Sequence, residues 1–175
     1  TTGHGIDSNI GENSEYVKAE HVKKAVQEKI YRSNKYDNKL LELLKDGTII
    51  LDTEGEVIGQ INGLTVLDMG DYCFGKPTRI TANTFMGEKG IVNIEREIEM
   101  SGTSHTKGVL ILSGYIGQKY AQDIPLSLTA SLCFEQLYNG VDGDSASSAE
   151  LYAVLSSLAE VPIKQSIAVT GSVNQ

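Results

Sequence analysis

The stretch Asp142-Gly143-Asp144-Ser145-Ala146-Ser147-Ser148-Ala149-Glu150 decides how the rest of the chain is interpreted. It is an acidic turn that contains a glycine, followed by a serine and by small residues of the kind that open a helix. The apolar residues that follow recur at helical spacing as far as Pro162. We therefore predict an amphipathic helix over residues 146 to 160, on the positions Leu151, Val154, Leu155 and Leu158.

Ser145 lies where this predicted helix begins. Unpaired backbone N–H groups and the positive end of the helix dipole at such a point stabilise a developing oxyanion. Gly143 permits the sharp turn that would project the serine outward. Taken alone, the stretch fits a structural interpretation better, because Ser147 and Glu150 match a capping box and Asp-Gly-Asp is common turn chemistry. The stretch alone does not decide between the two.

Strands are predicted on both sides of the stretch. Residues 126–135 alternate between apolar and polar, which is typical of a half-buried strand and would feed straight into the acidic turn. A short strand is expected over residues 167–169. Two further strand pairs are predicted around turns, 48–52 with 57–67 and 78–85 with 91–99, with a loop over 68–77. The order of these elements argues for the α+β class.

The N-terminal third has a different pattern. Residues 1–15 are polar and glycine-rich and are expected to form a disordered lead-in. Residues 16–33 carry an apolar stripe with helical period. The leucines at 40–44 indicate a second helix that closes at Asp46-Gly47, where the glycine suits a left-handed cap. Residues 16–47 are therefore predicted to form a short helical segment.

The stretch at Gly140 to Ser147 resembles the nucleophile motif of Lon proteases, and most strongly that of the archaeal B-type and of bacterial Lon-related ATP-dependent proteases. Further stretches resemble landmarks of that family in the same order: Asn62-Gly63-Leu64-Thr65-Val66, Phe74-Gly75-Lys76-Pro77-Thr78-Arg79-Ile80-Thr81, Lys107-Gly108-Val109-Leu110, Phe134-Glu135-Gln136 and Ala168-Val169-Thr170-Gly171-Ser172-Val173-Asn174-Gln175. The resemblance covers residues 48 to 175. It is much more specific than one motif alone.

The resemblance implies a Lon proteolytic-domain fold over residues 48–175, with mixed or antiparallel sheets and packed helices, C-terminally incomplete because the chain ends within a strand-like pattern. Residues 105–121 are ambiguous by composition, and the resemblance favours a helix there. The segment 16–47 resembles the end of an ATPase lid, or is an appendage of two helices that packs on the core.

The implied activity is that of an ATP-dependent serine endopeptidase that degrades unfolded or damaged proteins. Ser145 matches the nucleophile, Asp142 the acidic residue of the motif and Thr170 the threonine that helps to place a lysine. Lon proteases use a Ser-Lys dyad, in which a buried lysine of lowered pKa is the general base. Neither Lys107 nor Lys164 matches its motif position, so we expect the lysine beyond residue 175 and this chain to be inactive.

The resemblance also implies partners. The chain carries no cofactor of its own in this interpretation, and ATP and Mg²⁺ belong to an ATPase module outside it. Lon proteases act on protein and peptide substrates and assemble as homo-oligomeric hexameric rings. A non-catalytic α+β module for oligomerisation or binding is the alternative, and it predicts that Ser145 is buried or caps a helix.

A second alternative is a nucleotide-dependent enzyme that uses residues 70–78. Gly75-Lys76 there resembles a P-loop, but Pro77 follows where serine or threonine is required. Composition narrows the remaining classes. The net charge is −8 without a basic cluster, which argues against a nucleic-acid partner. No apolar run reaches membrane-spanning length, and two cysteines suit a reducing cytoplasm.

Overall fold

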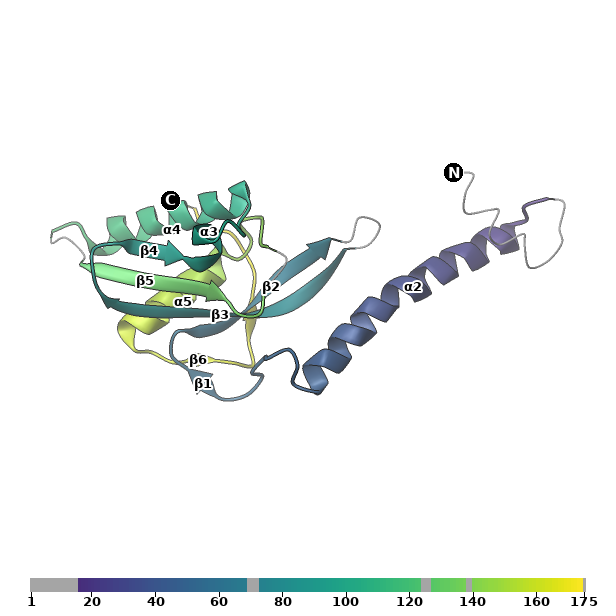
Figure 1. Cartoon of the computed structure of the whole chain (residues 1–175), viewed down its shortest axis with the longest axis horizontal. Coiled ribbons are helices and arrows are strands. Elements are labelled where there is room, and N and C mark those ends of the chain that lie inside the picture. The colour runs from purple at the N-terminus through teal and green to yellow at the C-terminus, as the bar shows by residue number, and fades with distance from the viewer. Residues whose placement is uncertain (1–15, 69–72, 124–126, 138–139, 175) are drawn as a thin grey trace. The chain divides into compact units, whose positions relative to one another are not determined.

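The structure of the chain, a computed structural model, describes residues 16–68, 73–123, 127–137 and 140–174 (Figure 1). The predicted lead-in over residues 1–15 lies outside the described residues. The chain divides into two compact units, residues 1–48 and 49–175.

In the first unit, the described residues form one helix, α2, over Ala19–Lys45. The prediction of two helices was therefore wrong. Residues 33–39 contain no glycine or proline, and their individual helix propensities cost only tenths of a kcal/mol each, so the helix continues through them. Its end was predicted correctly, because Asp46 is the C-cap and Gly47 has φ of 77°, in the left-handed region.

Within the described residues of the second unit, a five-stranded mixed sheet runs in the order β4-β5-β3-β2-β7. Its strands are β2 (Gln60–Asp68), β3 (Cys73–Met86), β4 (Gly90–Asn93), β5 (Leu128–Phe134) and β7 (Ala168–Val169). β2 with β3 and β3 with β5 are antiparallel, whereas β4 with β5 and β2 with β7 are parallel. Two short strands, β1 (Glu56–Val57) and β6 (Ile163–Lys164), form a second sheet.

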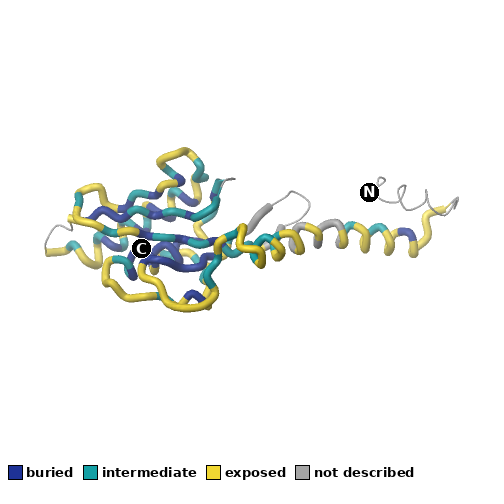
Figure 2. The backbone as a smooth tube through the Cα atoms, turned by 60° about the horizontal axis from the view of Figure 1, so that its bottom comes forward, coloured by how far each residue is buried: buried dark blue, intermediate teal, exposed yellow. Residues whose placement is uncertain are grey.

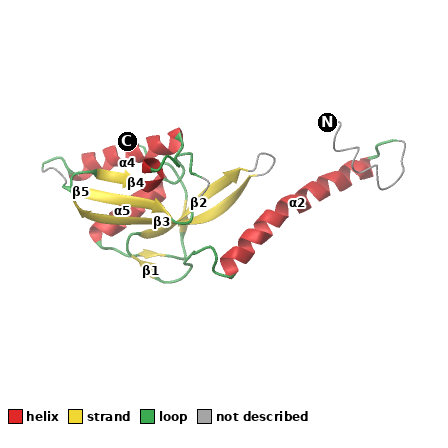
Figure 3. Cartoon of the chain, viewed as in Figure 1, coloured by secondary structure: helices red, strands yellow, loops and turns green. Residues whose placement is uncertain are grey.

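Helices α3 (Ile94–Glu97), α4 (Thr103–Tyr120) and α5 (Ser147–Ala159) complete this unit (Figure 3). The α+β class is therefore confirmed, with helices packed on a mixed sheet. The predicted strand over 126–135, the helix over 105–121 and the helix over 146–160 are confirmed within a few residues at each end. The short strand over 167–169 is confirmed as β7.

Both predicted hairpins were wrong. Residues 48–52 form no strand, because side chains hold them in place of a strand ladder. The Gln136 side chain accepts the Ile50 N–H at 2.7 Å, and the Asn62 side chain donates to the Asp52 carbonyl at 2.8 Å. Around residues 86–90, β3 and β4 are not neighbours, since β5 lies between them. A turn signal marks a chain reversal but does not say which strands pair.

Two boundaries also moved. The predicted strand over 91–99 ends at Asn93, whose side chain accepts the Arg96 N–H at 2.9 Å and caps α3. The predicted loop over 68–77 is shorter than expected, because Cys73 to Pro77 already belong to β3. Residues 69–72, the remainder of that loop, lie outside the described residues.

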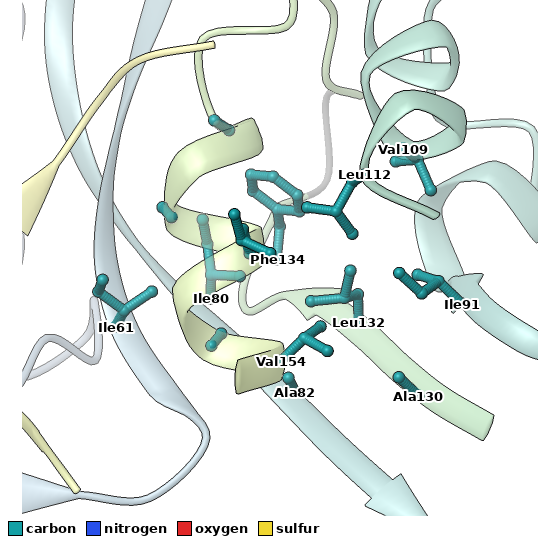
Figure 4. Packing of buried hydrophobic residues seen from close by; sticks show 14 of the residues in the cluster. Ile61, Ile80, Ala82, Ile91, Val109, Leu112, Ala130, Leu132, Phe134 and Val154 are labelled. Atoms are coloured by element: carbon teal, nitrogen blue, oxygen red, sulfur yellow. The ribbon is translucent and has the colours of Figure 1, made fainter. Parts of the chain in front are cut away.

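The core lies between one face of the five-stranded sheet and helices α4 and α5 (Figure 4). Alternate positions of β3 and β5 point into it, which is the period of two expected for a half-buried strand. The central buried side chains are Ile61, Ile80, Leu132, Phe134, Leu112, Val109 and Val154. The buried residues lie mainly along these strands and helices, as the colouring of the backbone shows (Figure 2). Among the described residues, no helix has the length and apolar character needed to cross a membrane.

Candidate active site

Ser145 lies in the turn between a bridge at Val141 and the start of α5, and it is exposed. Gly143 has φ of 83°, so the predicted role of this glycine in a sharp turn is confirmed. Within the described part of the chain, the Ser145 hydroxyl makes no hydrogen bond. The Ser145 hydroxyl is therefore exposed to solvent just before the N-terminus of α5.

The first N–H groups of α5 are partly occupied by backbone acceptors. Ser147 N–H donates to the Asp144 carbonyl at 3.1 Å, and Ser148 N–H donates to the Gly171 carbonyl at 3.0 Å. Among the described residues, the N–H groups of Ser145 and Ala146 have no acceptor. These two amides, rather than the whole first turn, are the groups free to bind an oxyanion.

The predicted capping box of Ser147 and Glu150 was wrong. Ser147 lies inside the helix, and its hydroxyl donates to the Asp144 carbonyl at 2.7 Å. Glu150 is fully buried. Because Glu150 lies in the core and Ser147 is bound to the preceding turn, the two side chains do not satisfy each other's amides.

Thr170 lies beside the backbone of the serine turn. Its hydroxyl donates to the Ser145 carbonyl at 3.3 Å, and the Gly171 N–H donates to the same carbonyl at 2.6 Å. The Gly171 carbonyl in turn accepts the Ser148 N–H. The segment after β7 therefore clamps the main chain on both sides of Ala146. The sequence-predicted pair of Ser145 and Thr170 is brought together through the backbone.

Asp142 is placed at the N-terminus of α4. Its carboxylate accepts the N–H groups of Ser104 at 3.1 Å and His105 at 3.3 Å. Hydrogen bonds from the backbone N–H groups of Gly143 and His105 hold the pKa of Asp142 below its usual value. A Cβ at Gly102 would collide with this carboxylate, so the glycine is required for the contact. The structure thus gives Asp142 the work of a cap on α4.

Two buried polar side chains beneath the turn were missed by the sequence analysis. His105 is 1% exposed and Glu150 is 0% exposed, and His105 Nε2 lies 3.6 Å from Glu150 Oε1. Burial lowers the pKa of His105 and raises the pKa of Glu150 to about 8, with the Glu95 carboxyl adding to the second effect. A signal existed, because Glu150 shares a helix face with Ala153 and Val154.

No general base contacts Ser145 within the described residues. Lys107 and Lys164 are both exposed, on α4 and β6, and neither is hydrogen-bonded to the serine. A cleft of about 580 Å³ adjoins the turn and is lined by Asp142, Val141, Gly140 and residues 99–102. It gives an extended ligand a place beside the turn.

The described part of the P-loop-like pattern is a strand. Gly75 to Thr78 lie in β3 and pair with β2, and Thr78 is buried with its hydroxyl 3.1 Å from that of Thr65. Residues 70–72 of the pattern lie outside the described residues. In the part of the chain that the structure describes, no three His, Cys, Asp or Glu side chains are grouped to hold a metal ion.

Comparison with known proteins supplies relatives for this arrangement. No protein-family model matches the chain. A protein of Escherichia coli strain K12 named "Putative Lon protease homolog" is 40% identical over 152 residues, which are 86% of this chain. The chain belongs to the Lon protease family.

Other members of the Lon protease family agree. A protein of the same name from Haemophilus influenzae is 40% identical over 73% of this chain, and an archaeal Lon protease of Archaeoglobus fulgidus is 29% identical over 93% of it. The chain spans about a quarter of the length of these relatives, namely 26%, 22% and 25%. The resemblance to a Lon proteolytic domain is thereby confirmed, and the fold agrees with it.

Proposed function

We propose that this chain is the proteolytic domain of a serine-type Lon peptidase and that Ser145 is its nucleophile. The observation that carries the proposal is an exposed serine hydroxyl beside the two backbone N–H groups, of Ser145 and Ala146, that have no acceptor among the described residues. A nucleophile next to fixed amide donors is the arrangement that acyl transfer requires. The non-catalytic alternative predicts a buried or capping serine, and Ser145 is neither.

The chemistry follows from these groups. The Ser145 oxygen attacks a peptide carbonyl, its proton passes to a general base, and the oxyanion is stabilised by the free amides. The amine leaves with a proton returned from that base, and water then hydrolyses the ester. Thr170 and Gly171 act on this step through the Ser145 carbonyl, which they hold in place.

The general base is proposed to be a lysine downstream of residue 175 in a longer protein, as in a Ser-Lys dyad. Support comes from Lys107 and Lys164, which are both exposed and make no hydrogen bond to Ser145 within the described residues, whereas a lysine that acts as a base is a buried one. The 175-residue chain alone is then expected to be inactive.

Peptide hydrolysis tests the proposal directly. A longer protein that includes the downstream region is expected to cleave a fluorogenic peptide, and Ser145→Ala is expected to lower kcat by at least about 10³-fold. Ser166→Ala is the matched control, because Ser166 is also exposed and makes no hydrogen bond to the serine turn within the described residues. Absence of cleavage by the longer protein would reject the peptidase. Cleavage by the 175-residue chain, lost in Ser145→Ala, would place the base within it.

ATP dependence, assembly into a hexameric ring, a cytoplasmic location and the degradation of unfolded proteins are proposed for the longer protein. They are supported by the family membership alone. ATP and Mg²⁺ would bind in an ATPase module outside this chain, since residues 75–78 form a strand and do not fit a phosphate. Peptide hydrolysis without ATP, together with protein degradation only with ATP, is the expected result.

A further inference from the structure

A group of polar side chains is buried in the core directly beneath the serine turn. Glu150 projects from the first turn of α5 and His105 from the first turn of α4. Asn93 Nδ2 lies 3.4 Å from Glu150 Oε1, and the Glu95 Oε1 atom accepts the Phe134 N–H at 2.8 Å. Peptide hydrolysis as proposed above uses none of these side chains.

Three atoms of this group are buried without a hydrogen bond among the described residues: Glu95 Oε2 and, in the pair of His105 and Glu150, Nε2 and Oε2. A buried polar atom without a hydrogen bond destabilises the folded state, so each of these atoms calls for an explanation. The two side chains face each other, with Nε2 and Oε1 only 3.6 Å apart.

The protonation states of the pair follow from their surroundings. The ring of His105 interacts with the Gly143 backbone. Burial favours the neutral ring, which carries one proton, and a proton on Nδ1 toward the Gly143 backbone leaves the lone pair on Nε2 facing Glu150. Glu150 is buried in the core, where an isolated carboxylate is strongly disfavoured, so it is neutral and carries an O–H.

We propose that neutral Glu150 donates a hydrogen bond to Nε2 of neutral His105, and that this buried pair positions the Asp142–Ser145 turn against α4. Glu150 Oε1 lies 3.6 Å from His105 Nε2 and 3.4 Å from Asn93 Nδ2. A shift of a few tenths of an ångström therefore brings an O–H on Oε1 to hydrogen-bonding distance of Nε2, while the same oxygen still accepts the Asn93 amide. The pair then joins the first turns of the two helices, and the backbone N–H of His105 donates to the Asp142 carboxylate of the serine turn at 3.3 Å. Both residues are positioning residues.

Among the described residues, the other titratable groups around the His105–Glu150 pair are Asp142, Cys133 and Glu95. Asp142 faces His105 and has a lowered pKa, so it stays ionised from pH 5 to 9. Cys133, on β5, lies near Glu95, and burial raises the pKa of the Cys133 thiol to about 11. Glu95, on α3, is the other carboxyl beside Glu150. A transition near pH 8 that is absent from Glu150→Gln reports on Glu150, whose pKa is raised to about 8.

The first test is NMR spectroscopy of the 175-residue chain with ¹⁵N-labelled histidine. At pH 7 we expect His105 to carry its proton on Nδ1, with a bare Nε2 whose resonance shows a hydrogen bond. Glu150→Leu should abolish the shift of the Nε2 resonance that the hydrogen bond causes. Glu150→Gln should retain that shift, because the glutamine side-chain amide also donates a hydrogen bond. A protonated Nε2 in the wild-type chain would overturn the proposal. This measurement needs no enzymatic activity, so its result is independent of whether the proposed peptidase activity exists.

The second test measures positioning through amide hydrogen exchange of Gly171, whose N–H donates to the Ser145 carbonyl. Raising the pH from 7 to 9 ionises Glu150 and should speed this exchange by about 10-fold beyond the intrinsic base-catalysed increase. Glu150→Gln should show the intrinsic increase alone. Because the pH change needs no substitution, the test holds even where Glu150→Leu fails to fold. Equal pH dependence in the wild type and in Glu150→Gln would reject the positioning role.

A third readout rests on the proposed function. In the longer protein, peptide hydrolysis should decline above about pH 8 in the wild type and not in Glu150→Gln. If the NMR signature is present and no peptide is cleaved at any pH, the pair stands and the peptidase proposal fails. If cleavage occurs with the same pH profile in both proteins, the positioning role fails and the peptidase stands.

Discussion

Asp142 links the serine turn to α4 through a single carboxylate. It accepts two backbone N–H groups at a helix N-terminus that has no capping side chain of its own, since Gly102 occupies the N-cap position. The carboxylate therefore does for α4 what an N-cap residue does within one chain segment. Asp142, which the sequence motif proposes as a site residue, therefore also holds the N-terminus of α4.

Replacing Asp142 by Asn should lower the thermal unfolding midpoint at pH 7, because an amide oxygen is a weaker acceptor than a carboxylate. The pKa of Asp142 is lowered in the folded state, so its stabilisation is present above its ordinary value of 3.8 and is lost as the pH falls further, through the folded pKa. The difference in midpoint between the two proteins should accordingly shrink below pH 3.8. Thermal scans across pH measure it.

Asp144→Asn is the matched control for that series. Asp144 is exposed in the same turn, and its side chain takes part in no hydrogen bond within the described residues. The two variants remove the same charge from nearly the same place. Equal effects of both variants at pH 7 would show that net charge, rather than the cap on α4, causes the loss.

At this scale the sequence revealed the exposed residues better than the buried ones. The position of Ser145 and the positive φ of Gly143 follow from local turn chemistry, which sequence records directly. The pairing of His105 with Glu150 depends on how α4 and α5 pack, because the two residues are 45 positions apart in the chain. Local pattern favoured a surface capping role for Glu150, because it does not register tertiary burial.

Helices α4 and α5 approach closely because α4 carries a glycine at the contact. A Cβ at Gly108 would lie 2.7 Å from the Ser147 hydroxyl oxygen and 3.4 Å from the Asp144 Cβ. The serine turn therefore rests on the bare backbone of α4. This contact fixes the height of the turn above the core.

Gly108→Ala should destabilise the protein by about 1–3 kcal/mol, because the added methyl group forces the two elements apart. Gly117→Ala on the same helix is the control, since a Cβ there meets nothing within 4 Å. That second variant should stabilise the protein by about 0.5–1 kcal/mol through helix propensity. Chemical denaturation measures both. Similar changes for the two variants would show that the close approach is not limiting.

The sequence predicted the helices and strands whose apolar residues recur with a clear period, but it did not predict which strands pair with each other. The alternation of β5 and the apolar spacing of α5 belong to single segments, so sequence shows them. The parallel pairing of β4 with β5 joins segments separated by α4, and no local signal encodes it. The short helix α3 was missed because Asn93 was taken as a strand residue rather than as its N-cap.

For the second compact unit as a whole, stability depends on one core shared by the sheet, α4 and α5. Leu112 on α4 is 0% exposed in that core, whereas Leu110 on the same helix is 58% exposed. Leu112→Ala should therefore cost about 2–5 kcal/mol, and Leu110→Ala no more than about 0.5 kcal/mol. Urea denaturation with fluorescence and circular dichroism measures the difference. Equal costs would contradict the described packing.

The clamp on the serine turn has a consequence for biosynthesis. The Ser145 carbonyl is held by Thr170, which follows it by 25 positions in the chain. A ribosome adds about 5–20 residues per second, so a nascent polypeptide carries Ser145 for a second or more before its clamp has been translated. During that interval the hydroxyl is made but its backbone is not yet fixed. A newly synthesised chain therefore gains the fixed backbone of the serine turn only after Thr170 has been translated.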